Sequence, residues 1–131
     1  MTTHHPTVSA AELLARYAAG ERFFGEMELD VPGMDMTGVV LDGIDFSGSF
    51  FDTSFRNASL RGARFCRSNV KCCDFSGADL TDADFTGAAL EATEWEGAVL
   101  TRTRFGDVSL YGAHLTETQF LELIVPSEPG T

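Results

Sequence analysis

The sequence predicts an all-β solenoid, in which the chain turns once every five residues and each repeat packs on its neighbours. The first observation is a large apolar side chain at every fifth position from Leu60 to Phe120. The second is a smaller residue two positions before each of them, such as Ala63 before Phe65. The third is glycine two positions after many of them, as at Gly62 and Gly77, where a tight turn is favoured.

The five-residue period excludes the two regular elements. On an α-helix, five residues rotate by about 500°, so the large residues would not share a face. On one continuous strand they would alternate between opposite faces, because five is an odd number. A chain that bends once per repeat can point every large and small residue inward, which is the behaviour of a solenoid.

Several segments, such as Ala78-Asp79-Leu80 and Ala83-Asp84-Phe85, closely match the Ala-(Asp/Asn)-Leu consensus of the pentapeptide-repeat family, which the chain resembles. The resemblance implies a right-handed, quadrilateral (four-sided) β-helix, with four repeats per turn and residues twenty apart stacked on each other. Opposite charges also recur at this spacing, as in Lys71–Glu91 and Asp82–Arg102. The expected domain is residues 21–125, with about five coils.

The N-terminal segment is expected to form a flexible lead over residues 1–7 and a capping helix over 8–20. Ser9 and Glu12 have the spacing of a capping box, and Gly20 is a natural stop. Leu13 and Tyr17 would turn an apolar stripe toward the solenoid, so the helix is predicted to cover the first coil. Early coils begin near Phe24 and Leu29 and are interrupted around residues 30–33.

One residue is missing from the repeat near Phe50 and Phe51, so only one of these two side chains can point inward. The first interpretation is a local irregularity at a corner. The second is that the outward phenylalanine contacts a partner, and Phe51, beside Asp52, is the candidate. The sequence leaves open which of the two rings is buried.

The C-terminal segment carries an apolar excess: Leu121, Leu123, Ile124 and Val125. Leu121 and Ile124 are expected to face outward, because Leu123 and Val125 continue the repeat. This edge either caps the last coil or forms a homodimer with a second copy, as gyrase-inhibiting members of the family do. Residues 126–131 are expected to be a flexible tail.

Composition restricts the partners and the compartment. The net charge of −11 disfavours nucleic acid and anionic membranes, and it suits a basic protein surface. Three cysteines favour a reducing, cytoplasmic location over a disulfide framework; Cys73 should point inward, and Cys66 and Cys72 outward. No apolar stretch is long enough for a membrane span, and no signal-peptide pattern is present.

No catalytic, cofactor-binding or metal-binding motif is found, so the protein is predicted not to be an enzyme. At a spacing of twenty, one column lacks balancing charge, and it supplies the candidate partner-binding residues: Asp35, Asp74, Glu94, His114 and the adjacent Glu96. The first hypothesis is a scaffold that presents a flat side to a protein partner. The alternative, from the resemblance, is a DNA mimic that inhibits or protects DNA gyrase, a type II topoisomerase.

Overall fold

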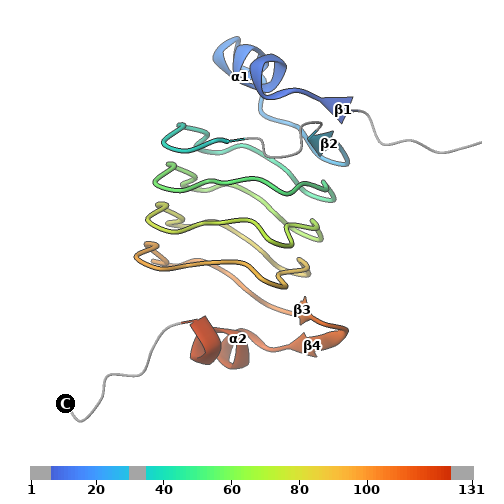
Figure 1. Ribbon diagram of the computed structural model, residues 1–131, viewed down its shortest axis with the longest axis vertical. Coiled ribbons are helices and arrows are strands. Elements are labelled where there is room, and N and C mark those ends of the chain that lie inside the picture. The colour runs from blue at the N-terminus through green and yellow to red at the C-terminus, as the bar shows by residue number, and fades with distance from the viewer. Residues whose placement is uncertain (1–6, 30–34, 125–131) are drawn as a thin grey trace, which may run out of the picture.

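The computed structural model describes residues 7–29 and 35–124, which form a stack of coils with a helix at each end (Figure 1). Helix α1 (Ala10–Ala18) lies above the stack and helix α2 (Glu117–Ile124) lies below it. The strands are short: β1 (Thr7–Val8), β2 (Glu28–Leu29), β3 (Val108–Leu110) and β4 (Ala113–Leu115). Neither described helix is long and apolar enough to span a bilayer.

Parallel β-bridges join successive coils in four columns, one for each side of the stack. The first side contains Asp35, Ser54, Asp74 and Glu94; the second Val40, Ser59, Asp79 and Val99; the third Phe23, Asp45, Arg64, Asp84 and Arg104; the fourth Glu28, Phe50, Asn69, Ala89 and Ser109. Partners lie 20 residues apart from Ser54 onward, as in Arg64–Asp84, and 19 apart across the missing residue, as in Asp45–Arg64. Asp45, Arg64, Asp84 and Arg104 on the third side therefore alternate in charge along the stack, with the four repeats per turn that the resemblance implied.

The corners are β-turns, each closed by a backbone hydrogen bond between residues three apart. In one of them, the N–H of Ala58 donates to the carbonyl of Phe55 at 3.0 Å. Asn57, the third residue of this turn, has φ 59°, and Gly62 occupies the equivalent position with φ 69°. A positive φ at this position is typical of type II turns and explains the glycines of the repeat.

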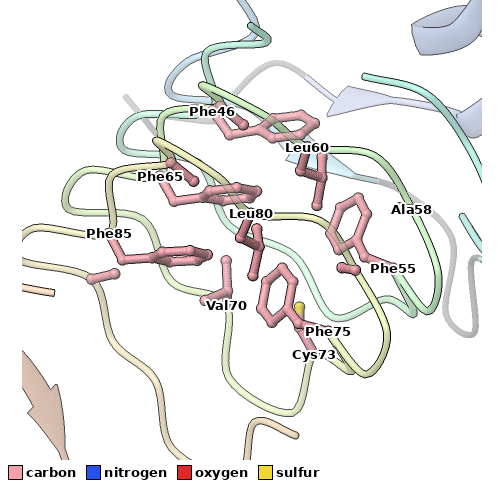
Figure 2. Packing of buried hydrophobic residues seen from close by; sticks show 14 of the residues in the cluster. Phe46, Phe55, Ala58, Leu60, Phe65, Val70, Cys73, Phe75, Leu80 and Phe85 are labelled. Atoms are coloured by element: carbon pink, nitrogen blue, oxygen red, sulfur yellow. The ribbon is translucent and has the colours of Figure 1, made fainter. Parts of the chain in front are cut away.

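The core consists of two stacks of aromatic rings that meet edge to face (Figure 2). Phe65 and Phe85 are stacked with centroids 4.6 Å apart, and Phe75 and Trp95 with centroids 4.8 Å apart. Phe75 meets Phe85 at 83°, a T-shaped contact. Such pairs stabilise a core beyond the burial of their area, and both stacks join residues twenty apart, the spacing that the resemblance implied.

At a spacing of twenty, Leu115 would stack beneath Trp95, but the stack of rings does not continue to it. Leu115 lies in β4, which pairs antiparallel with β3, and α2 then brings Phe120 against Trp95 and Phe105, with centroids 5.9 and 4.9 Å away. The turn between the strands differs from the others because Tyr111 and Gly112 both have positive φ, 50° and 85°. Two such residues form the tight type I′ turn of a hairpin, so the coil ends although the sequence repeat continues.

The N-terminal cap resembles the prediction but differs in detail. The Ser9 hydroxyl accepts the N–H of Glu12 at 3.1 Å, as expected of an N-cap. The Glu12 carboxylate instead pairs with Arg16 at 3.1 Å. Leu13 is buried. Thr7, assigned to the flexible lead, belongs to β1, which pairs with β2; residues 126–131 lie outside the described part of the chain.

Candidate functional site

The first side of the stack carries most of the predicted partner-binding residues. Asp35, Ser54, Asp74 and Glu94 form one continuous column of β-bridges, and Glu96 follows two residues after Glu94. His114 does not join the column. It pairs with Ser109 in the β3–β4 hairpin, and its Nδ1 lies 3.1 Å from Oδ1 of Asp107. The hairpin removes His114 from the position that a fifth stacked residue would occupy.

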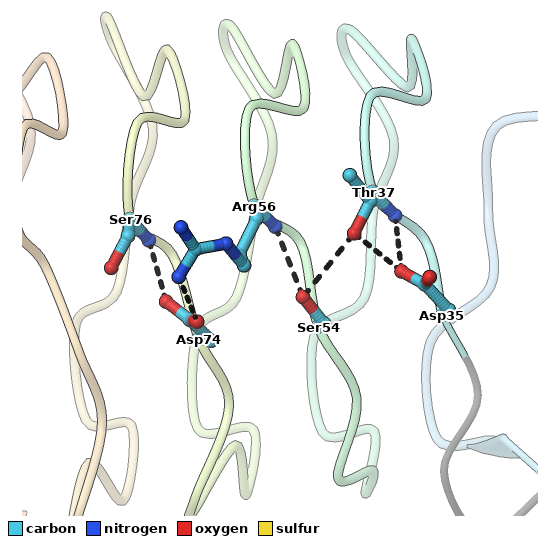
Figure 3. Close-up of polar contacts among 6 residues, drawn as sticks. All are labelled: Asp35, Thr37, Ser54, Arg56, Asp74 and Ser76. Atoms are coloured by element: carbon cyan, nitrogen blue, oxygen red, sulfur yellow. Dashed lines mark hydrogen bonds and ion pairs between the residues drawn. The ribbon is translucent and has the colours of Figure 1, made fainter.

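Asp74 is not an unbalanced charge, because Arg56 compensates it (Figure 3). Arg56 Nη1 lies 3.0 Å from Asp74 Oδ2, and the Ser76 N–H donates to Asp74 Oδ1 at 2.9 Å. Partial burial raises the pKa of Asp74, but the hydrogen bonds from Ser76 and Arg56 outweigh it and hold the pKa below its usual value. Arg56 and Asp74 are 18 residues apart in the sequence, so a search for charge pairs at a spacing of 20 does not find this contact.

Asp35 starts the column and is held by its own turn. Its carboxylate accepts the Thr37 hydroxyl and the Thr37 N–H, the latter at 2.9 Å. These bonds, the hydroxyl first, lower the pKa of Asp35, so the group is ionised at neutral pH. The aspartate is exposed at the surface, and its negative charge therefore faces solvent.

Phe51, the predicted partner contact, is the phenylalanine that points inward, and Phe50 is the one that points outward. Phe51 is 4% exposed and contacts the ring of Phe46 at 4.9 Å, so its prediction as a partner contact is wrong. Phe50 is 49% exposed on the fourth side. Phe51 is five residues after Phe46 and keeps the repeat, which places the missing residue between Phe51 and Phe55.

An open hollow of about 490 Å³ lies where the missing residue shortens the corner, lined by Asp35, Thr37, Asp52, Thr53, Ser54, Arg56, Cys72 and Asp74. A second hollow, of about 300 Å³, continues past Arg56 to Glu96. We call this surface the acidic side: Asp35, Asp52, Asp74, Glu94 and Glu96. Of these five carboxylates only Asp74 has an ion-pair partner within residues 7–29 and 35–124.

Two of the three cysteines, Cys66 and Cys73, are buried, and Cys72 is exposed. Burial raises the pKa of the Cys73 thiol to about 12, and its Sγ donates to the Phe51 carbonyl at 3.4 Å. Cys66 was expected to face outward, yet it is 8% exposed and burial raises its pKa as well. Cys72 is exposed at the rim of the larger hollow. Among the described residues, no three His, Cys, Asp or Glu side chains are grouped to hold a metal.

The C-terminal candidates belong to a helix that the repeat did not predict. Leu121 and Ile124 are half-buried against the core, which contradicts the expectation that they face outward. Leu123 is 66% exposed, and Val125 lies outside the described residues. The missed signal is Thr116-Glu117-Thr118-Gln119. Thr116 Oγ1 accepts the Gln119 N–H at 3.2 Å, and Gln119 Oε1 accepts the Thr116 N–H at 2.9 Å, a reciprocal capping box.

A family model of pentapeptide repeats matches residues 49–87 and 78–116, more than half of the chain. Among solved structures, the pentapeptide repeat protein Rfr23 from Cyanothece 51142 is similar with a TM-score of 0.55 and 17% identity. That alignment covers 67% of this chain and 56% of Rfr23, so the chain spans little more than half of that relative. No curated protein sequence matches the chain.

Two further pentapeptide repeat proteins have higher identity but lower TM-scores. The protein alr5209 from Nostoc PCC 7120 is 29% identical, with a TM-score of 0.46, and 82% of this chain and 84% of that one are covered. A protein of the Arabidopsis thaliana thylakoid lumen is 27% identical, with a TM-score of 0.36 and coverage of 79% and 81%. At 17% identity, the similarity to Rfr23 described above concerns the fold alone.

Proposed function

Because this chain belongs to the pentapeptide-repeat family, we propose that it is a non-enzymatic interaction module whose acidic side binds a basic surface of a protein partner. The observation that carries the proposal is the set of carboxylates left without a cation. Asp35, Asp52, Glu94 and Glu96 have no ion pair in the described part of the chain, and all four are exposed. Uncompensated charge of one sign steers and binds a surface of the opposite sign.

The other sides support this choice by contrast. On the fourth side Lys71 Nζ pairs with Glu91 Oε2 at 3.1 Å, and at a corner of the second side Arg102 Nε pairs with Asp82 Oδ1 at 2.6 Å. On the third side Arg64 Nε lies 4.0 Å from Asp45 Oδ2. These three pairs each balance a carboxylate within the protein, whereas four of the five carboxylates of the acidic side have no ion pair among the described residues.

The proposal includes the absence of catalysis. The core is filled by stacked rings, and the larger hollow is an open surface feature beside Arg56 and Cys72. Catalytic sites usually need a concave pocket that excludes water and holds several reacting groups together. An open hollow of this kind is better suited to a side chain of a binding partner.

A charge-reversal experiment tests the proposal. The chain and its Asp52→Lys/Glu94→Lys variant would be used to capture partners from an extract of the native cell. A Glu26→Lys/Glu28→Lys variant is the matched control, because it makes the same charge change at two glutamates outside the acidic side, of which Glu28 lies on the fourth side. A partner retained by the control and lost by the acidic-side variant supports the proposal. Equal capture by both variants contradicts it.

The second candidate is the DNA mimic of a type II topoisomerase, which the net charge of −11 and the acidic column favour. Duplex DNA carries one charge per roughly 1.7 Å, so a mimic needs a dense acidic track. Arg56 interrupts that track at Asp74. In a gyrase supercoiling assay, inhibition by the wild type that is lost in Glu94→Lys/Glu96→Lys would favour the mimic over the interaction module.

Association of two copies through the C-terminal end stays a proposal. Leu123 is the most exposed apolar residue of α2, at 66%, and is the described residue best placed to meet a second copy. A solution mass of two chains that falls to one in Leu123→Lys would support this contact. A mass unchanged by the substitution would contradict it.

A further inference from the structure

Hydrogen bonds between coils follow one rule on every complete side. On the second side, the N–H groups of Leu80 and Asp82 donate to the carbonyls of Val99 and Thr101, both at 2.9 Å. Val99 N–H returns a bond to the Ala78 carbonyl at 2.8 Å. Each side of a coil therefore offers two donors and one acceptor to the coil that follows it.

In the last coil, the equivalent donors and acceptors of the first and second sides have no hydrogen-bond partner within the described residues. On the second side these groups are the N–H of Leu100 and of Arg102 and the carbonyl of Ala98; on the first side they are the N–H of Trp95 and of Gly97 and the carbonyl of Thr93. We call the backbone of residues 93–102 the open edge. On the third side helix α2 supplies an acceptor, because the Phe105 N–H donates to Glu117 Oε1 at 2.8 Å.

Side chains along the open edge are also incompletely covered. Ala78 and Leu80 are fully buried, whereas Ala98 and Leu100, one coil further on, are only half-buried. Val99 is 44% exposed. Helix α2 places Phe120 under Trp95 and Phe105, so it covers that part of the core and leaves the Leu100 part accessible. The open edge thus combines backbone groups that have no partner among residues 7–29 and 35–124 with an apolar contact.

Position also restricts what can pair with this edge. A second flat coil stacked on the end would meet α2, which lies beneath the last coil in Figure 1. A single segment that bends once, as the chain does in the turn closed by the Ala98 N–H and the Trp95 carbonyl, avoids the helix, because it needs only the rim of the first and second sides. Glu94 and Glu96 on this rim are exposed and have no ion pair among the described residues, so a basic segment is electrostatically suited to it.

We infer that the open edge binds a segment of a partner protein that pairs in parallel with the first and second sides and bends at the corner between them, with basic side chains beneath Glu94 and Glu96 and an apolar side chain beneath Leu100. This inference deepens the proposed function and rests on it, because the same acidic rim attracts the partner. Backbone pairing supplies affinity in such strand addition, and the side chains supply specificity. Each side contributes three hydrogen bonds, as between Ala78–Asp82 and Val99–Thr101.

The test uses a synthetic probe that repeats the spacing of residues 94–101. The acetylated and amidated peptide Lys-Ala-Lys-Gly-Ala-Val-Leu-Thr places lysines beneath the two glutamates and leucine beneath Leu100. Its matched form carries methyl groups on the backbone nitrogens of the first lysine and of the valine, which removes two donors and keeps the charge. Calorimetry should show binding of the first peptide and at least about tenfold weaker binding of the second.

Amide hydrogen exchange locates the contact within the chain. Without peptide, the N–H groups of Leu100 and Arg102 should exchange much faster than those of Leu80 and Asp82, their bonded equivalents one coil earlier. With peptide, protection should appear at Leu100 and Arg102. Glu94→Lys/Glu96→Lys should lose binding of the peptide, and Glu26→Lys/Glu28→Lys should retain it.

The outcomes separate this inference from the proposed function. Equal affinity for both peptides would overturn strand addition and leave charge-driven docking on the acidic side in place. Protection at Ser54 without protection at Leu100 would have the same meaning. No binding of either peptide would overturn the inference, while the capture experiment with Asp52→Lys/Glu94→Lys would still decide the proposed function.

Discussion

The carboxylate of Glu117 accepts the backbone N–H of Phe105 at 2.8 Å, and this bond joins helix α2 to the last coil of the stack. A solenoid end exposes both core side chains and unpaired backbone groups. Glu117 satisfies one such donor, and Phe120, three residues later on the same helix, covers the adjacent rings. The helix thus satisfies one donor of the third side and covers the centre of the end.

Removing this carboxylate should destabilise the C-terminal end. We expect Glu117→Ala to lower the free energy of unfolding by about 1–2 kcal/mol, because a hydrogen bond to a charged acceptor is lost. Glu117→Gln keeps an acceptor and should lose less. Urea unfolding followed by circular dichroism measures both. Equal losses in the two variants would show that the acceptor contributes little.

Truncating a central ring should cost much more. Phe85 is fully buried between Phe65 and Phe105, with centroids 4.6 and 5.3 Å away. Phe85→Ala should therefore lower the free energy of unfolding by about 3–5 kcal/mol. Val99→Ala, at a residue 44% exposed, is the control and should change stability by less than about 0.5 kcal/mol. A small effect at Phe85 would be inconsistent with the stacked core.

At the corners, replacing glycine by alanine should lower the stability of the fold, and replacing alanine by glycine should raise it. Gly62 has φ 69°, and no atom lies within 4 Å of the position that an added methyl group would take, so Gly62→Ala tests backbone conformation without a clash. We expect it to cost about 1 kcal/mol. Ala92 has φ 59°, and Ala92→Gly should stabilise the fold by about 0.5 kcal/mol, since relief of strain exceeds the added chain entropy. Thermal unfolding of both variants checks the signs.

Acid should destabilise the protein through the aspartates of the turns. The Thr81 hydroxyl and N–H donate to Asp79 Oδ1 at 2.6 and 3.1 Å and lower its pKa. A carboxyl with a lower pKa in the folded state contributes stability above its unfolded pKa of about 3.9, and this is lost as the pH falls through the folded pKa. Denaturant unfolding should therefore give level stability from pH 7 to about 5 and a decrease below about pH 4. Asp79→Asn should make that decrease shallower; an unchanged slope would exclude a contribution from Asp79.

The periodic part of the fold could be predicted closely because the repeat is a local rule. The stacking of Phe65 on Phe85 and the order of charges on the third side both follow from counting residues. The candidate site was predicted less well. The Arg56–Asp74 contact runs diagonally between neighbouring coils, and His114 leaves its column at a hairpin. Both depend on geometry at a corner or an end, where the repeat no longer decides neighbours.

By itself, the sequence determined which large side chain fills the core in each regular repeat and the family to which the chain belongs, because an apolar residue at every fifth position can be buried only by a chain that turns once per repeat. Only the tertiary structure decided where the repeat stops being a coil. Tyr111 and Gly112 turn the chain back on itself, Phe120 covers the core from a helix, and Phe51 rather than Phe50 points inward. These outcomes depend on competition between packing, turn conformation and end capping, which residue spacing does not encode.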